Sequence, residues 1–187
     1  TLISSAEMDA SAAKAYGDIL AEARKKERLN RDRAQTERVR AIANRLIPST
    51  AAFRPDAPRW GWEVNVITSE EVNAWCMPGG KIAFYTCLID KLKVTDDELA
   101  AVMGHEIAHA LREHGRERAS QAAVQQGLLS LGGALLGLGE GSMQLAGIVS
   151  EVTFTLPNSR AHETEADRVG VELAARAGYD PRAAITL

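Results

Sequence analysis

Two histidines four positions apart, His105 and His109, enclose Glu106 in the segment HEIAH. Four residues are close to one helical turn, so both imidazoles would project from the same helix face and could share one metal ion. Glu106 would lie beside them, where a carboxylate can take a proton from a water molecule. The spacing predicts a hydrolytic metal site, and zinc is the metal that it favours.

A catalytic zinc commonly has three protein ligands, so a third must come from elsewhere in the chain. The extended motif HExxHxxGxxH is excluded, because Arg112 and Gly115 stand where it needs glycine and histidine. His114 would point about 140° away from His109 around a continuous helix, since each residue turns by roughly 100°. We interpret His114 as a surface or structural histidine.

A carboxylate is the other candidate for the third ligand, and the segment HETEAD at residues 162–167 offers several. Glu163 and Asp167 would share one face of a helix, whereas Glu165 would point elsewhere. If Glu163 binds zinc, Asp167 could accept the free imidazole N–H of a ligating histidine. The alternative is that both are solvated helix charges. Gly170 is small enough to let this helix approach a neighbour closely.

The hydrophobic pattern predicts the elements that position these residues. The Thr95-to-Glu98 spacing is a capping box for a helix that should run to about His114 and end at Gly115, and Gly178 should end the last helix. Pro78-Gly79-Gly80 predicts a tight turn between two strands. The other expected elements are one or two helices in residues 6–47, a loop in 48–58, strands in 60–68, 72–77 and 81–86, a helical hairpin or mobile lid in 120–150, and a helix in 160–177.

Length and composition set the class of protein. The chain has 187 residues, a net charge of −3 and 45% hydrophobic residues, which fits one folded domain and gives no electrostatic case for nucleic acid. We predict one predominantly helical α+β domain over 1–187, with an N-terminal helical segment at 1–47 and a core at 60–180 that carries the expected zinc site. Cys76 and Cys87 lack metal-site spacing and should be free, largely buried thiols.

No continuous apolar run reaches 18 residues, so the sequence predicts no ordinary membrane-spanning helix. The Gly-rich stretch 127–147 should cover the cleft, contact a membrane surface or serve as core and loop filling. Because the chain begins at Thr1 without a methionine, processing or trimming could have removed a segment that attaches it to a membrane.

The sequence resembles the M48 metallopeptidases at several places. His105-Glu106-x-x-His109 followed by Glu163-x-x-Ala166-Asp167 is similar to the family pattern, and so are Leu156-Pro157 and Ser159-Arg160. The segment NAWCMPGGKI at residues 73–82 resembles the one that precedes the active-site helix in small periplasmic members. The resemblance covers roughly residues 60–180. Asn158 and Cys87 depart from it, since an aromatic residue and a glycine are common at these positions.

The resemblance implies a zincin-like fold and a complete site. His105, His109 and Glu163 would bind one Zn²⁺, Glu106 would be the general base, and Asp167 would support a ligand from behind. The strand at 81–86 would be the edge along which an extended substrate lies. The group that stabilises the oxyanion is open among His162, Arg160, Tyr179 and a residue beyond the chain's end.

The function expected from these features is zinc-dependent hydrolysis of peptide bonds in unfolded or misfolded envelope proteins. The location implied by the resemblance is the periplasm, with membrane anchoring as an option. The alternative is an envelope chaperone or binding module with a latent zinc site, and hydrolysis of a non-peptide amide also stays open.

Overall fold

The computed structural model describes residues 2–127 and 143–186. Seven α-helices and three strands lie in the described ranges. They are α1 (Ser5–Lys25), α2 (Arg33–Leu46), β1 (Glu63–Ile67), β2 (Ala74–Met77), β3 (Lys81–Tyr85), α3 (Thr86–Lys91), α4 (Asp96–Leu111), α5 (His114–Gln125), α6 (Met143–Phe154) and α7 (Arg160–Arg176). Short 3₁₀ turns occur at Ile47–Ala52, Ala57–Arg59 and Pro181–Ile185. The predicted class, α+β and mostly helical with a small sheet, is confirmed.

The sheet has the strand order β1-β3-β2. β3 pairs in parallel with β1 and in antiparallel with β2, through the predicted turn at Gly79 and Gly80, which both have positive φ. The interpretation of residues 81–86 as an open edge for substrate is therefore wrong, because β3 is the central strand and both of its edges are paired. A tight turn shows that two strands are neighbours, but it does not show which of them a third strand covers.

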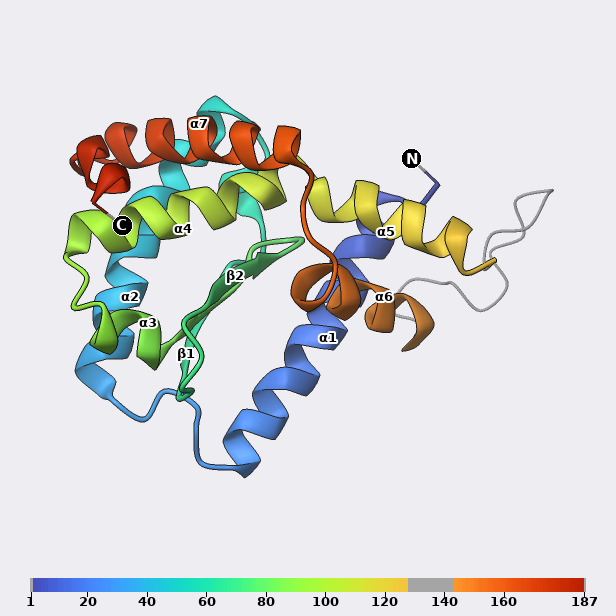
Figure 1. Cartoon of the computed structure of the whole chain (residues 1–187), viewed down its shortest axis with the longest axis horizontal. Coiled ribbons are helices and arrows are strands. Elements are labelled where there is room, and N and C mark those ends of the chain that lie inside the picture. The colour runs from blue at the N-terminus through green and yellow to red at the C-terminus, as the bar shows by residue number, and fades with distance from the viewer. Residues whose placement is uncertain (1, 128–142, 187) are drawn as a thin grey trace.

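Helices cover both faces of the sheet (Figure 1). Alternating side chains of the strands, Ala74 and Cys76 among them, join the core under α2, α4 and α7. The side chains between them, including Trp75 and Met77, join a second core with α1, α5 and α6. Every residue of β1 except Glu63 is buried. Two-sided cover makes the sheet a rigid base for α4.

The outer edge of β1 is blocked by polar side chains. Arg40 on α2 donates from Nε to the carbonyl of Val64 at 2.8 Å. Asn30, in the connection between α1 and α2, donates its backbone N–H to Val66 and accepts the Val66 N–H on Oδ1. Neither group leaves room for an added strand here. β2 provides the remaining edge of the sheet.

The N-terminal region forms two helices in succession, which settles the choice left by the sequence. Ser4 and Asp32 cap the two helices with their side chains. α1 is tied to the sheet by Tyr16, whose hydroxyl donates to the carbonyl of Ile82 at 2.5 Å and accepts from Asn65 at 2.8 Å.

The helix that carries the HExxH motif begins as predicted and ends earlier than predicted. Its capping box at Thr95 and Glu98 is present. The helix ends at Leu111, and Glu113 takes a left-handed conformation with φ of 54° before α5 begins at His114. This conformation is costly for a residue other than glycine. Hydrogen bonds and ion pairs from Ser5, Arg54 and Arg116 hold the Glu113 carboxylate and offset the cost.

Gly115 therefore lies inside α5 and does not end a helix, which corrects that prediction. The segment at 120–150 contributes the end of α5 and the start of α6, while residues 128–142 lie outside the described residues, so a lid there stays a prediction. Among the described helices, none is long and apolar enough to cross a membrane. The two cysteines are free and largely, though not completely, buried, as expected.

Candidate active site

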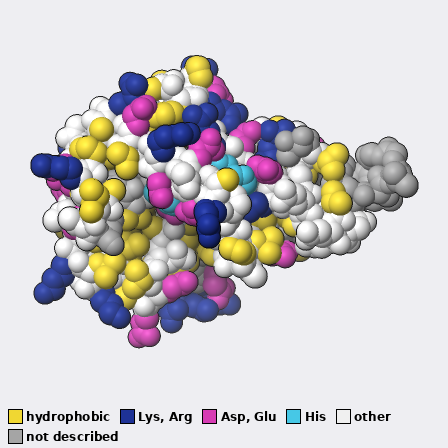
Figure 2. All heavy atoms as spheres, turned by 45° about the horizontal axis from the view of Figure 1, so that its top comes forward, with side chains coloured by type: hydrophobic (Ala, Val, Ile, Leu, Met, Phe, Trp, Pro, Cys, Tyr) yellow, Lys and Arg dark blue, Asp and Glu magenta, His cyan; other side chains and the backbone are white. Residues whose placement is uncertain are grey.

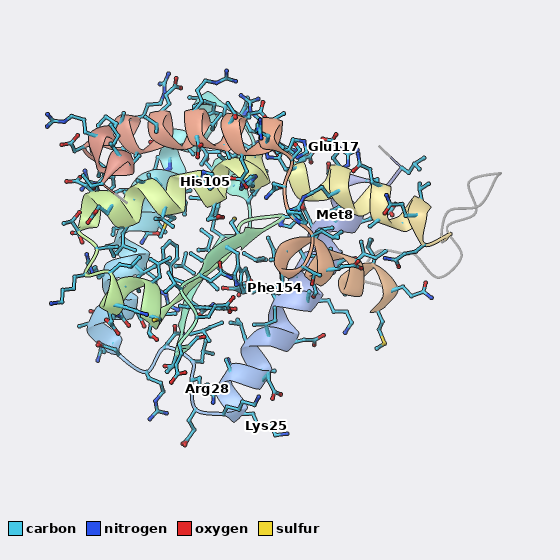
Figure 3. All side chains as sticks on the ribbon, viewed as in Figure 1. Met8, Lys25, Arg28, His105, Glu117 and Phe154 are labelled. Atoms are coloured by element: carbon cyan, nitrogen blue, oxygen red, sulfur yellow. The ribbon has the colours of Figure 1, made fainter. Side chains whose placement is uncertain are left out.

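The site is formed where α4 and α7 cross with their backbones in contact. A methyl group at Gly170 would lie 2.7 Å from the backbone nitrogen of His105, and one at Gly104 would lie 2.7 Å from the carbonyl oxygen of Gly170. Only hydrogen fits at both positions. This contact places the start of α7 beside the face of α4 that carries the histidines (Figure 3).

His105, His109 and Glu163 offer ligand atoms that all lie within 4.8 Å of one another. Nε2 of His105 is 2.9 Å from one carboxylate oxygen of Glu163, and Nε2 of His109 is 3.3 Å from the other. Nε2 of His109 is buried and has no hydrogen-bond partner within the described part of the chain. A buried nitrogen of this kind needs a partner, and a metal ion between the three side chains would supply one.

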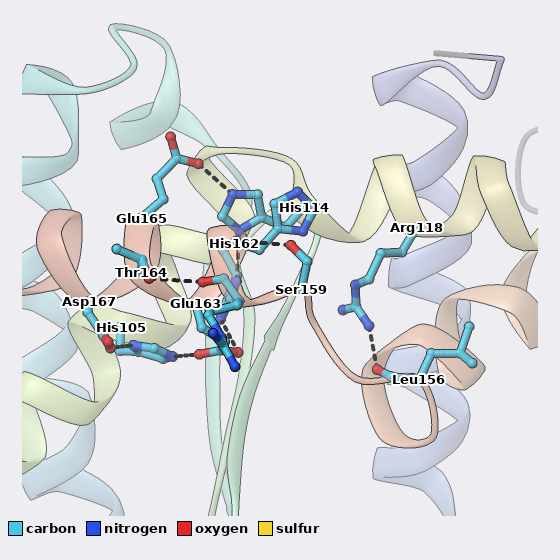
Figure 4. Close-up of polar contacts among 12 residues, drawn as sticks. His105, His114, Arg118, Leu156, Ser159, His162, Glu163, Thr164, Glu165 and Asp167 are labelled. Carbon is cyan, nitrogen blue, oxygen red and sulfur yellow. Dashed lines mark hydrogen bonds and ion pairs between the residues drawn. The ribbon is translucent and has the colours of Figure 1, made fainter.

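Asp167 lies behind His105, as its spacing from Glu163 predicted. The Asp167 Oδ1 atom is 2.8 Å from Nδ1 of His105 (Figure 4). An ionised carboxylate only accepts hydrogen bonds, so Nδ1 carries the proton and Nε2 keeps its lone pair toward the site.

His114 does not point away from His109, because the helix is broken between them. Nδ1 of His114 is 2.8 Å from Nδ1 of His109, and its Nε2 is 2.6 Å from Oε1 of Glu165 (Figure 4). The His114 side chain is buried, and the ring of His162 stacks on it at 4.1 Å between centroids. His114 is therefore not a surface residue. A helix assumed to continue to His114 could not reveal this contact.

Burial shifts the pKa values of two groups at the site strongly. Desolvation, helped by the charge of Glu163, raises the pKa of Glu106 to about 8. Desolvation, with smaller contributions from the neighbouring histidines and Arg118, lowers the pKa of His109 to about 3. A neutral His109 can offer a lone pair to a metal, and a bound cation would favour the ionised form of Glu106.

A hollow beside the histidines connects the site with the end of the sheet. Glu106, His109 and Cys76 contribute to its wall, together with Asn158 and Arg118. Histidine and acidic side chains are visible together at the surface in Figure 2. Asn158, one of the two departures from the family pattern, thus borders the hollow, and its buried Oδ1 has no hydrogen-bond partner in the described ranges. Cys87, the other departure, lies on α3 and does not line it.

Arg118 is a cation at this site that the motifs did not indicate. Its Nη1 donates to the carbonyl of Leu156 at 2.5 Å. Burial lowers the pKa of Arg118, although the negative charge of Glu163 acts in the opposite direction. Tyr179 is excluded as an oxyanion donor, because it packs against Arg45 beyond the far end of α7. The helix rises by 1.5 Å per residue, which puts Tyr179 roughly 20 Å from Glu163. Nε2 of His162 is 2.9 Å from Glu117.

A helix with His-Glu-x-x-His, crossed by a second helix that supplies a glutamate beside a sheet edge, defines the class of metal-dependent peptidases. The model of peptidase family M48 matches residues 33–187, so the chain belongs to this family of metallopeptidases.

Among curated proteins, the chain is 39% identical over 129 residues to a mitochondrial metalloendopeptidase OMA1 of Arabidopsis thaliana, covering 67% of the chain and 25% of that protein. It is 35% identical over 153 residues to OMA1 of Bos taurus, covering 78% and 29%. It is 28% identical over 125 residues to the beta-barrel assembly-enhancing protease of Escherichia coli K12, covering 63% and 26%. The chain thus spans about a quarter of the length of these relatives.

Proposed function

We propose that this chain is a zinc-dependent endopeptidase that hydrolyses peptide bonds in unfolded or misfolded proteins. The observation that carries the proposal is the convergence of His105, His109 and Glu163, with Glu106 beside them. Nε2 of His109 lies at this point and has no hydrogen-bond partner within the described residues. Membership of a metallopeptidase family supports the proposal independently.

Two nitrogens and a carboxylate oxygen are a ligand set that suits zinc and leaves a coordination position free. A zinc ion bound there would polarise the scissile carbonyl and make a water molecule more acidic. Glu106 would accept the proton of that water and deliver it to the leaving amine. The low dielectric around Glu106 strengthens its proton affinity, which favours the first transfer, from the water to the carboxylate.

The edge of β2 is our candidate for substrate docking, in place of the strand at 81–86. Tyr85 donates its N–H to the carbonyl of Asn73. In an antiparallel pair only alternate residues exchange hydrogen bonds, so the backbone groups of residues 73, 75 and 77 point toward β3. The backbone groups of Ala74 and Cys76 then face away from β3. An extended peptide could add there through main-chain hydrogen bonds, which tolerate many sequences and suit an unfolded substrate. Because β2 packs against α4 and Cys76 lines the hollow with Glu106, a peptide on this edge would pass the site.

The setting that we propose is the cell envelope, as the periplasmic resemblance implied. One group of relatives is named as mitochondrial, and the names in the other group refer to beta-barrel assembly. Both names are compatible with proteolysis close to a membrane. Attachment to a membrane through a segment outside this chain, and unfolded envelope proteins as partners, belong to the same proposal.

Mass spectrometry of an unfolded protein such as casein tests the activity. The zinc-loaded chain should produce internal cleavages, a chelator should stop them, and added zinc should restore them. Glu106→Gln should lower the rate by at least about 10²-fold, because it removes the proton acceptor. Glu172→Gln on the exposed face of α7 is the matched control and should cleave like the wild type.

The rival function is a chaperone or binding module with a latent zinc site. It would be favoured if the zinc-loaded wild type suppressed aggregation of casein and cut no bond in it. Cleavage that is equal in the wild type and Glu106→Gln would instead point to a contaminating protease and contradict the proposed role of Glu106.

A further inference from the structure

The contact of His109 with His114 is the feature of the site that the zinc ligands alone do not explain. Nδ1 of His109 lies 2.8 Å from Nδ1 of His114, and Nε2 of His114 lies 2.6 Å from Glu165. These three residues come from α4, α5 and α7, so the contact joins three helices at one point.

The order of donors and acceptors in this chain follows from the chemistry of its last member. An ionised carboxylate has no proton to give, so Nε2 of His114 must donate to Glu165. A neutral imidazole carries one N–H, so Nδ1 of His114 must accept. Nδ1 of His109 is then the donor, and the lone pair of His109 is left on Nε2, the buried atom that faces Glu163.

The surroundings hold His114 in the orientation that this chain needs. The side chain of His114 is only 3% exposed, and the His162 ring lies over it with an interplanar angle of 11°. The His162 ring is held in turn by Glu117 at 2.9 Å. Glu165 itself is reachable from solvent and makes its second contact with Arg112 at 4.0 Å.

We propose that His114 and Glu165 are positioning residues that fix His109 in the tautomer and orientation that bind the metal. This inference rests on the proposed zinc site and extends it, because Asp167 contacts only His105 and would fix the tautomer of that ligand alone. Each histidine ligand would then have its own carboxylate. His105 contacts Asp167 directly, and His109 reaches Glu165 through His114. Partners of this kind commonly change metal affinity by about 10–100-fold.

Zinc affinity, measured by competition with a chromophoric chelator, tests the inference without relying on activity. Glu165→Ala should weaken zinc binding by about 10-fold, because His114 loses the acceptor that sets its tautomer. Glu165→Gln should stay within about 3-fold of the wild type, since the amide oxygen can still accept from His114. Glu172→Ala is the matched control, because this glutamate lies on the same helix and pairs only with Arg176 in the described structure.

Urea unfolding of the metal-free proteins separates positioning from a merely structural role. We expect the loss of zinc affinity in Glu165→Ala to exceed the loss that the unfolded fraction of this variant would explain. Zinc binding by Glu165→Ala within 2-fold of Glu172→Ala would overturn the inference, and so would a loss accounted for by unfolding. His114→Phe, which keeps the ring stack but lacks both nitrogens, should weaken binding at least as much as Glu165→Ala. A wild type that takes up no stoichiometric zinc would contradict the proposed metal site itself.

Discussion

At the scale of single residues, burial sets the protonation state of the groups that would do the chemistry. Glu106 is desolvated by burial and lies beside the charge of Glu163, so the metal-free protein keeps it protonated near neutral pH. His109 is held neutral by the same desolvation. A divalent cation would compensate both effects, since it favours a carboxylate and uses a neutral imidazole as its ligand.

The stability of the metal-free protein should therefore depend on pH through Glu106. Its pKa is about 8 in the folded state, against 4.5 for an ordinary glutamate. The unfolded state therefore releases the proton first, and the stability of the folded state falls between these two values as pH rises. Glu106→Gln cannot lose this proton. Between pH 5 and pH 8, the free energy of unfolding of the wild type should fall relative to Glu106→Gln by on the order of 3 kcal/mol.

Urea unfolding of both metal-free proteins at the two pH values measures this difference. The comparison with Glu106→Gln removes the contribution of the other titrating groups, which both proteins share. A difference between the two proteins that does not change with pH would show that Glu106 is not desolvated in the way described.

At the scale of elements, the crossing of α4 and α7 decides whether a third ligand can reach the two histidines. Gly104 and Gly170 let the helix backbones touch, and Glu163 lies two turns before Gly170 on the same helix. The requirement at this crossing is steric: a side chain at either position would meet backbone atoms, which cannot rotate away.

Gly170→Ala should push the two helices apart. A methyl group there would lie 2.8 Å from Cα of His105, so zinc binding should weaken by roughly 10-fold or more and the fold should lose about 1–3 kcal/mol. Gly17→Ala is the control, because its position in α1 has open space around it and alanine favours a helix by up to about 1 kcal/mol. Equal zinc affinity in both variants would contradict the steric account.

The sequence predicted the local features of single helices better than the connections between helices. The motif on α4, the capping box at Thr95 and the pair Glu163 and Asp167 depend on spacing within one helix, and the structure has all of them where they were expected. The break at Glu113 depends on contacts with Arg54 and Ser5 from distant segments, so no local pattern indicates it. The contact of His114 with His109 follows from that break and was missed with it.

At the scale of the whole molecule, α1 completes the fold although it lies outside the part matched by the family model. It covers the face of the sheet that carries Trp75 and Met77, and Tyr16 binds the central strand. The strand order belongs to this scale too. The sequence predicted three strands and one turn, but the parallel pairing of β1 with β3 arises from long-range packing and placed the open edge on β2.

Tyr16→Phe should lower the free energy of unfolding by on the order of 1–2 kcal/mol, because it leaves a buried amide of Asn65 without its acceptor. The control is Tyr85→Phe, whose side chain is only partly buried and whose hydroxyl accepts one bond from Trp75 at 3.2 Å. Urea unfolding of the metal-free proteins should show the larger loss for Tyr16→Phe. Equal losses would mean that α1 is not anchored to the sheet through this hydroxyl.

The ligand set of the metal is the central claim, and X-ray absorption at the zinc edge of the zinc-loaded chain tests it most directly. We predict one zinc per chain with two imidazole nitrogens and carboxylate or water oxygens at roughly 2.0–2.2 Å. Glu163→Gln should change the oxygen contribution and leave both imidazoles in place. A sulfur ligand at roughly 2.3 Å from Cys76, or a third imidazole from His114, would contradict the account.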